Sequence, residues 1–126
     1  MEYSVDISLD INGAYKHQKI QVKQLDESTR KIVIELLKDG TEFVPSSFDS
    51  VEFRCKKSNG EVSKQTSEDD VNPVTVDSDG LVHVTLNGET LSTNGTTYCD
   101  LAFKTGDDIL SSEPFIMYVV KSPHMQ

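Results

Sequence analysis

The residues with the most reactive side chains are two cysteines and three histidines, and their spacing fits no catalytic motif. Cys55 and Cys99 each fall at an apolar position of a strand-like alternation, where a free cysteine behaves as a small buried hydrophobic residue. A cysteine nucleophile needs a neighbouring base and an open, electropositive setting. His17, His83 and His124 are scattered, and no Gly-x-Ser-x-Gly motif marks a serine hydrolase. We therefore predict no catalytic residues and a protein that is not an enzyme.

One acidic segment superficially resembles a calcium-binding loop. If the glycine of Asp77-Ser78-Asp79-Gly80 is aligned with the invariant glycine of such a loop, Thr75 takes the first ligand position and Leu86, rather than glutamate, takes the last. A β-turn explains these residues more simply. The cysteines have no second Cys or His at zinc-finger spacing, and the glycines form no phosphate-binding loop. The sequence therefore predicts no metal site and no cofactor.

The oxidation state of the two cysteines is a separate question. The start of the chain has no basic segment leading into an apolar one, so it does not read as a secretory signal. We therefore expect synthesis in the cytoplasm and buried thiols at Cys55 and Cys99. The alternative is a disulfide, because two opposed strands of a β-sandwich can bring such residues together. Titration of thiols under denaturing, non-reducing conditions decides between them.

Size and charge limit the partners. A length of 126 residues fits a single domain, which we expect to span residues 1–126. The formal net charge of -9 argues against nucleic acid and against an anionic membrane as partners. The longest apolar run, residues 115–120, is far shorter than the ~20 residues of a membrane-spanning helix. We therefore predict neither a nucleic-acid nor a membrane partner.

The charges are unevenly distributed along the chain. Up to Lys64 there are ten basic and eleven acidic residues, whereas only Lys104 and Lys121 face ten acidic residues after it. This imbalance predicts an acidic surface on the second half. Such a surface either serves solubility or steers a basic partner.

The segment 51–62 predicts a half-buried β-hairpin. Apolar Val51, Phe53 and Cys55 alternate with charged residues, as on a strand with one buried face. Asn59-Gly60 then provides a two-residue turn. In that register Val62 opposes Lys57 and lies on the buried face.

Alternating segments recur along the rest of the chain. Including the hairpin, we expect about eight or nine short strands, which is typical of an all-β antiparallel sandwich. We interpret residues 66–72 as a polar surface loop and residues 89–92 as a connection with one short helical turn. The other predicted strands cover residues 3–11, 17–24, 30–37, 74–76, 81–86, 96–103 and, interrupted near Pro114, 109–120.

The last strand is apolar on both faces. Phe115, Met117 and Val119 point one way, and Ile116, Tyr118 and Val120 point the other way. One face of each sheet in a two-layer sandwich is normally in contact with water. We therefore predict that Ile116, Tyr118 and Val120 lie in or beside a protein interface; the alternative is that loops or the opening strand cover them.

The order of these patterns resembles one family over nearly the whole chain, the N-terminal domain of the baseplate upper proteins of tailed phages of Gram-positive bacteria. The main matching segments are SVEFRCKKSNGEV at residues 50–62 and GLVHVTL at residues 80–86. Further similar segments are ISLDIN at 7–12, VKQ at 22–24, GTTYCDLAF at 95–103 and SEPFIMYVVK at 112–121.

The resemblance implies an immunoglobulin-like β-sandwich with a structural role and no catalysis. Such a domain docks onto the core of the tail baseplate and carries a distal receptor-binding module. The chain would then be either the N-terminal domain of a longer protein or a short member of the family, located in the virion, with other tail and baseplate proteins as its partners. An interface at the last strand would join it either to such a partner or to a second copy in a homo-oligomer.

The alternative function is a ligand-binding sandwich such as a carbohydrate-binding module. Carbohydrate platforms usually expose stacked aromatic side chains, whereas this chain has no Trp, only 7% aromatic residues and tyrosines that are dispersed in the sequence. Clear hits in a glycan screen would favour this alternative.

Overall fold

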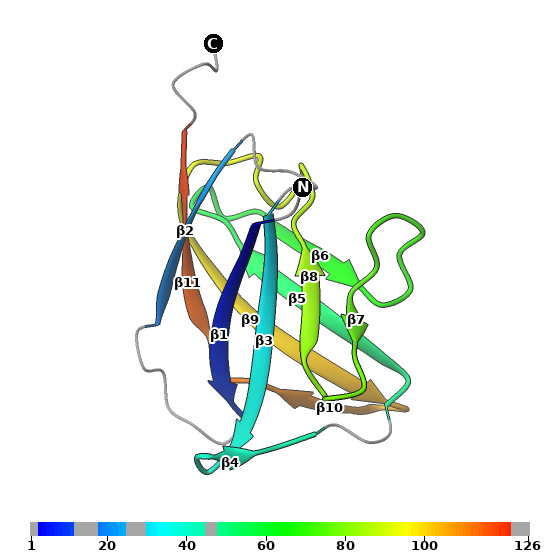
Figure 1. Cartoon of the computed structure of the whole chain (residues 1–126). Coiled ribbons are helices and arrows are strands. Elements are labelled where there is room, and N and C mark those ends of the chain that lie inside the picture. Colours follow the sequence, from blue (N-terminus) through cyan, green and yellow to red (C-terminus); the bar gives the residue numbers. More distant parts are fainter. Residues whose placement is uncertain (1–2, 12–17, 25–29, 45–47, 122–126) are drawn as a thin grey trace.

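The computed structural model describes residues 3–11, 18–24, 30–44 and 48–121, which form strands and turns in two facing sheets (Figure 1). The strands of the smaller sheet are β1 (Tyr3–Asp10), β3 (Arg30–Lys38), β4 (Thr41–Glu42), β7 (Thr75–Val76) and β8 (Val82–Thr85). Those of the larger sheet are β2 (Lys19–Lys23), β5 (Ser50–Lys56), β6 (Val62–Thr66), β9 (Gly95–Thr105), β10 (Asp108–Ser111) and β11 (Phe115–Val120). The predicted all-β sandwich is confirmed.

The strand order defines the edges of each sheet. The smaller sheet runs β1-β3-β8-β7, with β4 paired to β3, and the larger sheet runs β2-β11-β9-β5-β6, with β10 paired to β9. The described residues contain more strands than expected for two reasons. The strand β4, only two residues long, was not predicted, and the predicted segment 109–120 divides into β10 and β11. No helix occurs among them, and residues 89–92 form hydrogen-bonded turns instead.

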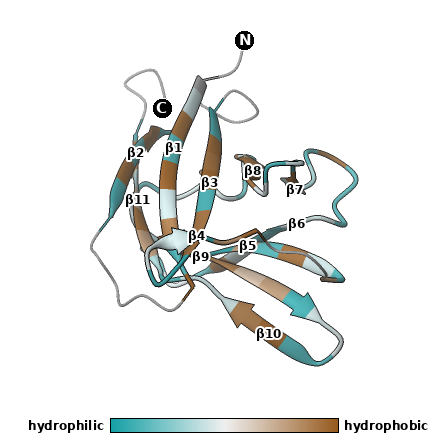
Figure 2. Cartoon of the chain, turned by 60° about the horizontal axis from the view of Figure 1, so that its bottom comes forward, coloured by the Kyte–Doolittle hydropathy of each residue, from teal (hydrophilic) through white to brown (hydrophobic). Residues whose placement is uncertain are grey.

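Apolar residues that alternate along the strands fill the space between the sheets. Ile32, Ile34 and Leu36 on β3 are fully buried, as a period of two on a strand with one inner face requires. The rings of Phe53 and Phe115 pack in this core with centroids 6.1 Å apart. Figure 2 shows the same alternation of apolar and polar residues along β1 and β3.

Strand direction differs from the expectation at one edge of each sheet. Most neighbours are antiparallel, but β1 pairs with β3, and β2 with β11, in parallel. The chain passes from β1 into the other layer as β2 and returns as β3, so β2 supplies the crossover that a parallel pair needs. Alternation shows which face of a strand is buried but not which way the strand runs. The expectation of purely antiparallel pairing is corrected at these two edges.

The β5–β6 hairpin has a different register from the predicted one. Val62 pairs with Lys56 rather than Lys57, and the Lys57 amide donates to the Glu61 carbonyl at 2.8 Å. The loop therefore has three residues and ends in Gly60 with a φ of 88°, the usual geometry of a three-residue hairpin. A shift of one residue moves a side chain to the opposite face. The prediction that Val62 is buried was wrong, and its side chain is 62% exposed.

A buried amide connects the two layers where β6 meets the end of β8. The Gln65 side chain is only 1% exposed, and its Nε2 donates to the Thr85 carbonyl at 2.6 Å. Its Oε1 accepts from the Asn87 amide at 3.1 Å and from the Thr90 hydroxyl at 2.9 Å. A buried amide with its hydrogen bonds formed adds directional constraints to an otherwise apolar contact. Gln65 therefore helps to fix how the sheets face one another.

Candidate functional site

The outward-pointing side chains of the larger sheet form a continuous surface, called the outer face below. Residues directly opposite one another on neighbouring strands project to the same side. Lys56 is opposite both Val62 and Tyr98. Ile116 is opposite both Tyr98 and Lys19, so one row crosses five strands. The outer face comprises Lys19, Gln21, Lys23, Glu52, Arg54, Lys56, Val62, Lys64, Thr66, Thr96, Tyr98, Asp100, Ala102, Lys104, Ile116, Tyr118 and Val120.

The three residues predicted for an interface all belong to the outer face. Phe115, Met117 and Val119 of β11 are buried in the core, whereas Tyr118 is 43% exposed and Ile116 and Val120 are half-buried. The flanking strands cover these three side chains only in part. Their availability to a partner is thus compatible with the prediction, which stays a prediction.

Two more exposed hydrophobic residues stand beside them and were missed from the sequence. Tyr98 of β9 is 52% exposed and Val62 of β6 is 62% exposed. The signal for Tyr98 in the sequence was its place between Thr97 and Cys99, two positions on the apolar side of the strand alternation. Both are buried, so the ring of Tyr98 points outward. Val62 was missed because the hairpin register was wrong. The apolar part of the outer face is therefore wider than β11 alone.

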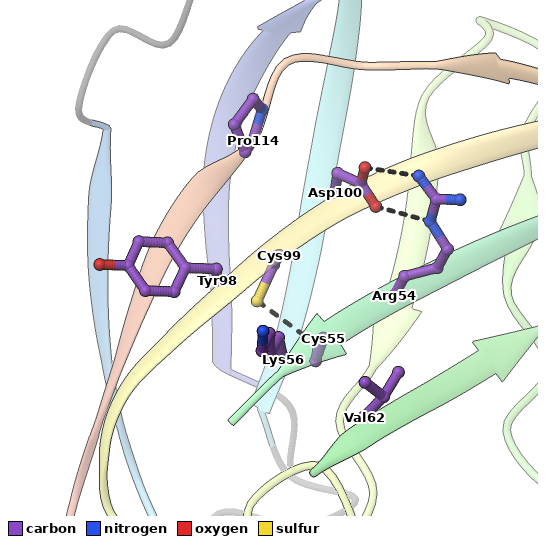
Figure 3. A pocket seen from close by; sticks show the side chains of 8 residues that line it. All are labelled: Arg54, Cys55, Lys56, Val62, Tyr98, Cys99, Asp100 and Pro114. Atoms are coloured by element: carbon purple, nitrogen blue, oxygen red, sulfur yellow. Dashed lines mark hydrogen bonds and ion pairs between the residues drawn. The ribbon is translucent and has the colours of Figure 1, made fainter. Parts of the chain in front are cut away.

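A pocket of about 280 Å³ lies in the outer face, above the buried Cys55 and Cys99 (Figure 3). The side chains of Val62, Tyr98 and Pro114 contribute to its apolar lining. The other lining residues are Arg54, Lys56 and Asp100. Such a hollow suits an apolar side chain of a partner, with charged groups at its margin.

An ion pair between two neighbouring strands forms one wall of this pocket. Arg54 Nε donates to Asp100 Oδ1 at 2.8 Å and Arg54 Nη2 donates to Asp100 Oδ2 at 2.6 Å, a bidentate arrangement (Figure 3). The hydrogen bond to Asp100 raises the pKa of Arg54 above its ordinary value, and partial burial opposes this rise. Arg54 Nη2 also donates to the Ser111 hydroxyl at 3.2 Å. The guanidinium is thus held in place.

The outer face is basic although the chain as a whole is acidic. Its acidic residues are Glu52 and Asp100, which pair with Lys104 at 3.1 Å and with Arg54 at 2.6 Å. Four further lysines lie on the same strands, in a protein with a formal net charge of -9. The acidic residues are therefore concentrated elsewhere. The further lysines are Lys19, Lys23, Lys56 and Lys64.

The two cysteines meet beneath the outer face. Cys55 and Cys99 are directly opposite one another on β5 and β9, buried and unbridged, with their Sγ atoms 3.4 Å apart. Burial raises the pKa of the Cys99 thiol well above its ordinary value, and the contact with Cys55 raises it further. The reactive form of cysteine is the thiolate. Cys99 therefore stays protonated at neutral pH and is a poor nucleophile.

The acidic segment 77–80 forms a turn, as expected. Asp77 Oδ1 accepts from the amides of Asp79 at 2.9 Å and Leu81 at 3.0 Å. Asp77 Oδ2 lies 2.7 Å from His83 Nε2. The hydrogen bond from His83 is the main reason why the pKa of Asp77 is below its ordinary value. His17 and His124 lie outside the described residues.

The described ranges of the chain contain no group of three or more His, Cys, Asp or Glu side chains placed to hold a metal ion. They also contain no helix that is long and apolar enough to cross a membrane.

Comparisons with known proteins point to one family. A family model described as the BppU N-terminal domain matches residues 2–125. Forty-two chains of known structure match this chain. One is the N-terminal domain of ORF48 of phage TP901-1, with a TM-score of 0.65 at 16% identity over 92% of this chain and 97% of that chain. At this identity the likeness shows the fold alone. No protein with a curated description matches.

Proposed function

The chain belongs to the family of BppU N-terminal domains, structural domains of the phage baseplate, and from this premise we propose that it docks onto the tail core and carries a distal receptor-binding module. The family match over residues 2–125 is the observation on which this proposal rests. The resemblance seen in the sequence is thereby confirmed. The immunoglobulin-like form of the sandwich is compatible with the two sheets described above.

A role without catalysis fits the chemistry of the described residues. Cys99 is buried with a raised thiol pKa, and the one described histidine, His83, is hydrogen-bonded to Asp77. A general base needs access to a substrate and a free position for its proton. We therefore propose a domain that positions other proteins rather than one that transforms a substrate.

The outer face is the proposed docking surface. Ile116, Tyr118 and Val120 lie on it beside Tyr98, and a pocket opens next to Tyr98. Exposed aromatic and aliphatic groups surrounding a pocket are typical of the centre of a protein interface, with charged groups at the rim. The partner is therefore proposed to cover β11 and β9 on the side away from the core.

The remaining assignments follow from the family. We propose that residues 1–126 act as one domain, the N-terminal part of a longer protein. We also propose synthesis in the cytoplasm of the host cell and assembly into the tail baseplate of the virion.

The test is capture of tail proteins by the immobilised chain from cells that express the phage tail genes, followed by identification of what is retained. We expect a tail or baseplate protein, and we expect the double variant Ile116→Ser, Tyr118→Ala to retain at least about tenfold less of it. Val33→Ser is the matched control, because Val33 is half-buried on β3 of the other sheet. Equal loss in the control, or no tail protein retained by the wild type, would contradict the proposal.

One observation favours the carbohydrate-binding alternative. Tyr98 pairs with Ile116 and Tyr118 pairs with Thr96, so the two rings occupy diagonal positions on one face although they are dispersed in the sequence. Exposed aromatic faces can stack on sugar rings. A glycan array with the wild-type chain and with Tyr98→Ala decides between the two functions. Hits lost in this variant would favour the alternative.

A further inference from the structure

The buried contact between Cys55 and Cys99 is a feature that the proposed docking role does not use. The two residues are directly opposite one another on the antiparallel strands β5 and β9, and they are 44 positions apart in the sequence. Their Sγ atoms lie 3.4 Å apart, and both thiols are free (Figure 3). The fold thus holds two distant thiols in contact inside its core.

The hydrogen bonds of β5 allow this contact. The Val51 carbonyl accepts from the amide of Ser67, just after β6, and every second residue of a strand bonds the same neighbour. Cys55, four residues after Val51, therefore bonds β6, and its pairing with Cys99 carries no hydrogen bonds. In such pairs the Cα atoms are about 4.5 Å apart. This separation falls within the range of about 4.4–6.8 Å that a disulfide spans.

We propose that Cys55 and Cys99 form a modification site, at which a low-molecular-weight disulfide such as oxidised glutathione converts the two thiols into a disulfide between β5 and β9. One cysteine thiolate attacks the small disulfide, which gives a mixed disulfide and releases one small thiol. The other cysteine then attacks the protein sulfur of the mixed disulfide and releases the second small thiol. The protein loses two hydrogens and two electrons, and the small disulfide gains them.

The native fold should favour this bond. The sulfur atoms have to approach by about 1.4 Å, from 3.4 Å to the length of a disulfide. The unfolded chain instead has to close a long loop to bring the same sulfur atoms together. The equilibrium constant for disulfide formation should therefore be larger in the folded chain, and the disulfide should in turn stabilise the fold.

The site is closed to reagents while the sheet is intact. The Cys55 and Cys99 side chains are 2% and 1% exposed. Burial raises the pKa of Cys99, and the thiolate is the attacking form. Exchange with the small disulfide therefore takes place while the chain folds or while β5 and β9 separate locally. A reducing cytoplasm keeps the pair as thiols, and an oxidising environment outside the cell favours the disulfide.

The disulfide would join the two strands that carry much of the outer-face pocket. Arg54 and Lys56 of β5 line this pocket. Tyr98 and Asp100 of β9 line it as well. A covalent bond beneath them restrains the separation of the two strands. This consequence rests on the proposed function, which places the chain in a virion, where disulfides persist; the chemical step does not depend on it.

The experiment compares the exchange equilibrium with and without the fold. The reduced wild-type chain is diluted from urea into native buffer, or kept in urea, at several ratios of reduced to oxidised glutathione. Free thiols are then alkylated, the mass of the chain is measured, and the joined peptides are identified after digestion. We expect a disulfide between Cys55 and Cys99, with an equilibrium constant at least about tenfold larger in native buffer than in urea.

The matched control is Cys55→Ala with Lys56→Cys. It moves one thiol by one position along β5, so the loop that closes in urea keeps almost the same length. On the folded strand this thiol points to the outer face, on the opposite side of the sheet from Cys99. The control should therefore form less disulfide in native buffer than in urea.

Three results would overturn the inference. They are a wild type without an intramolecular disulfide, an equilibrium constant no larger in native buffer than in urea, and an oxidised chain that lacks the circular dichroism of the reduced native protein. Equal behaviour of the wild type and the control would overturn it as well. Because the test uses the isolated chain, failure to capture a tail protein would contradict the proposed function alone.

Discussion

The Sγ atoms of Cys55 and Cys99 lie 3.4 Å apart across two neighbouring strands, and both residues are almost completely buried. The hydrogen bonds of β5 place this pair where directly opposed side chains approach most closely. The Lys57 amide donates to the carbonyl of Glu61, the residue just before β6, and residues at every second position along a strand bond the same neighbour. Cys55 therefore bonds β6 and not β9, so Cys55 and Cys99 form a non-hydrogen-bonded pair.

The first prediction concerns the reactivity of these thiols. A water-soluble thiol reagent should modify neither cysteine in the native protein, because both thiols are shielded from solvent and burial raises the pKa of Cys99. In denaturant without reductant, two thiols per chain should react. The single variants Cys55→Ala and Cys99→Ala, each with one reactive thiol after unfolding, calibrate the count. Fewer than two thiols in the unfolded wild type would show a disulfide instead.

The second prediction concerns the amide that connects the sheets. Gln65→Leu should destabilise the protein by about 2–3 kcal/mol, because the Thr85 carbonyl and the Asn87 amide would be left without their partner. Urea unfolding gives the free energy directly. Gln21→Leu is the matched control, since Gln21 is exposed on β2 and its replacement should change stability by less than about 0.5 kcal/mol. Equal effects of the two substitutions would contradict a connecting role for Gln65.

The third prediction is a pH dependence carried by Asp77. The hydrogen bond from His83 lowers the pKa of Asp77 from its ordinary value of 3.8. A carboxyl group whose pKa is lower in the folded state stabilises that state above the ordinary pKa and loses this contribution as the pH falls through the folded value. Asp77→Asn should therefore be less stable than wild type at neutral pH.

The difference between wild type and Asp77→Asn should shrink as the pH falls below 3.8. Thermal unfolding from neutral to strongly acidic pH measures it. Asp77→Ala is the companion variant, because it also loses the oxygen that accepts from the amides of Asp79 and Leu81. It should be the less stable of the two variants at every pH. A difference between wild type and Asp77→Asn that is constant with pH would contradict a lowered pKa of Asp77.

The sequence predicted the layers of the fold better than it predicted the pairing of strands. Alternation on β11 placed Phe115 in the core and Tyr118 outside, because the period of a strand fixes the side to which each residue points. It could not show that β2 lies parallel to β11, since strand direction depends on how distant segments pack. The eleven strands and two mixed sheets therefore needed the three-dimensional structure.

The candidate site was predicted in part for the same reason. Ile116, Tyr118 and Val120 were identified from one strand, whereas Tyr98 joins them only through the pairing of β9 with β11. The basic character of the outer face also arises from lysines on β2, β5 and β6, which are distant in sequence. A count of charges along the chain emphasised the acidic second half instead. Such clusters depend on sheet order, which no local pattern encodes.

The last prediction tests the hairpin that presents Val62 on the outer face. Gly60 has a φ of 88°, and a Cβ added there would meet no atom within 4 Å. The cost of Gly60→Ala is therefore conformational alone, about 1–2 kcal/mol. Gly60→Asn should cost less, because Asn adopts the left-handed conformation more readily than Ala does. If urea unfolding gave Ala and Asn the same small effect, Gly60 would not need a positive φ, and this geometry of the loop would be contradicted.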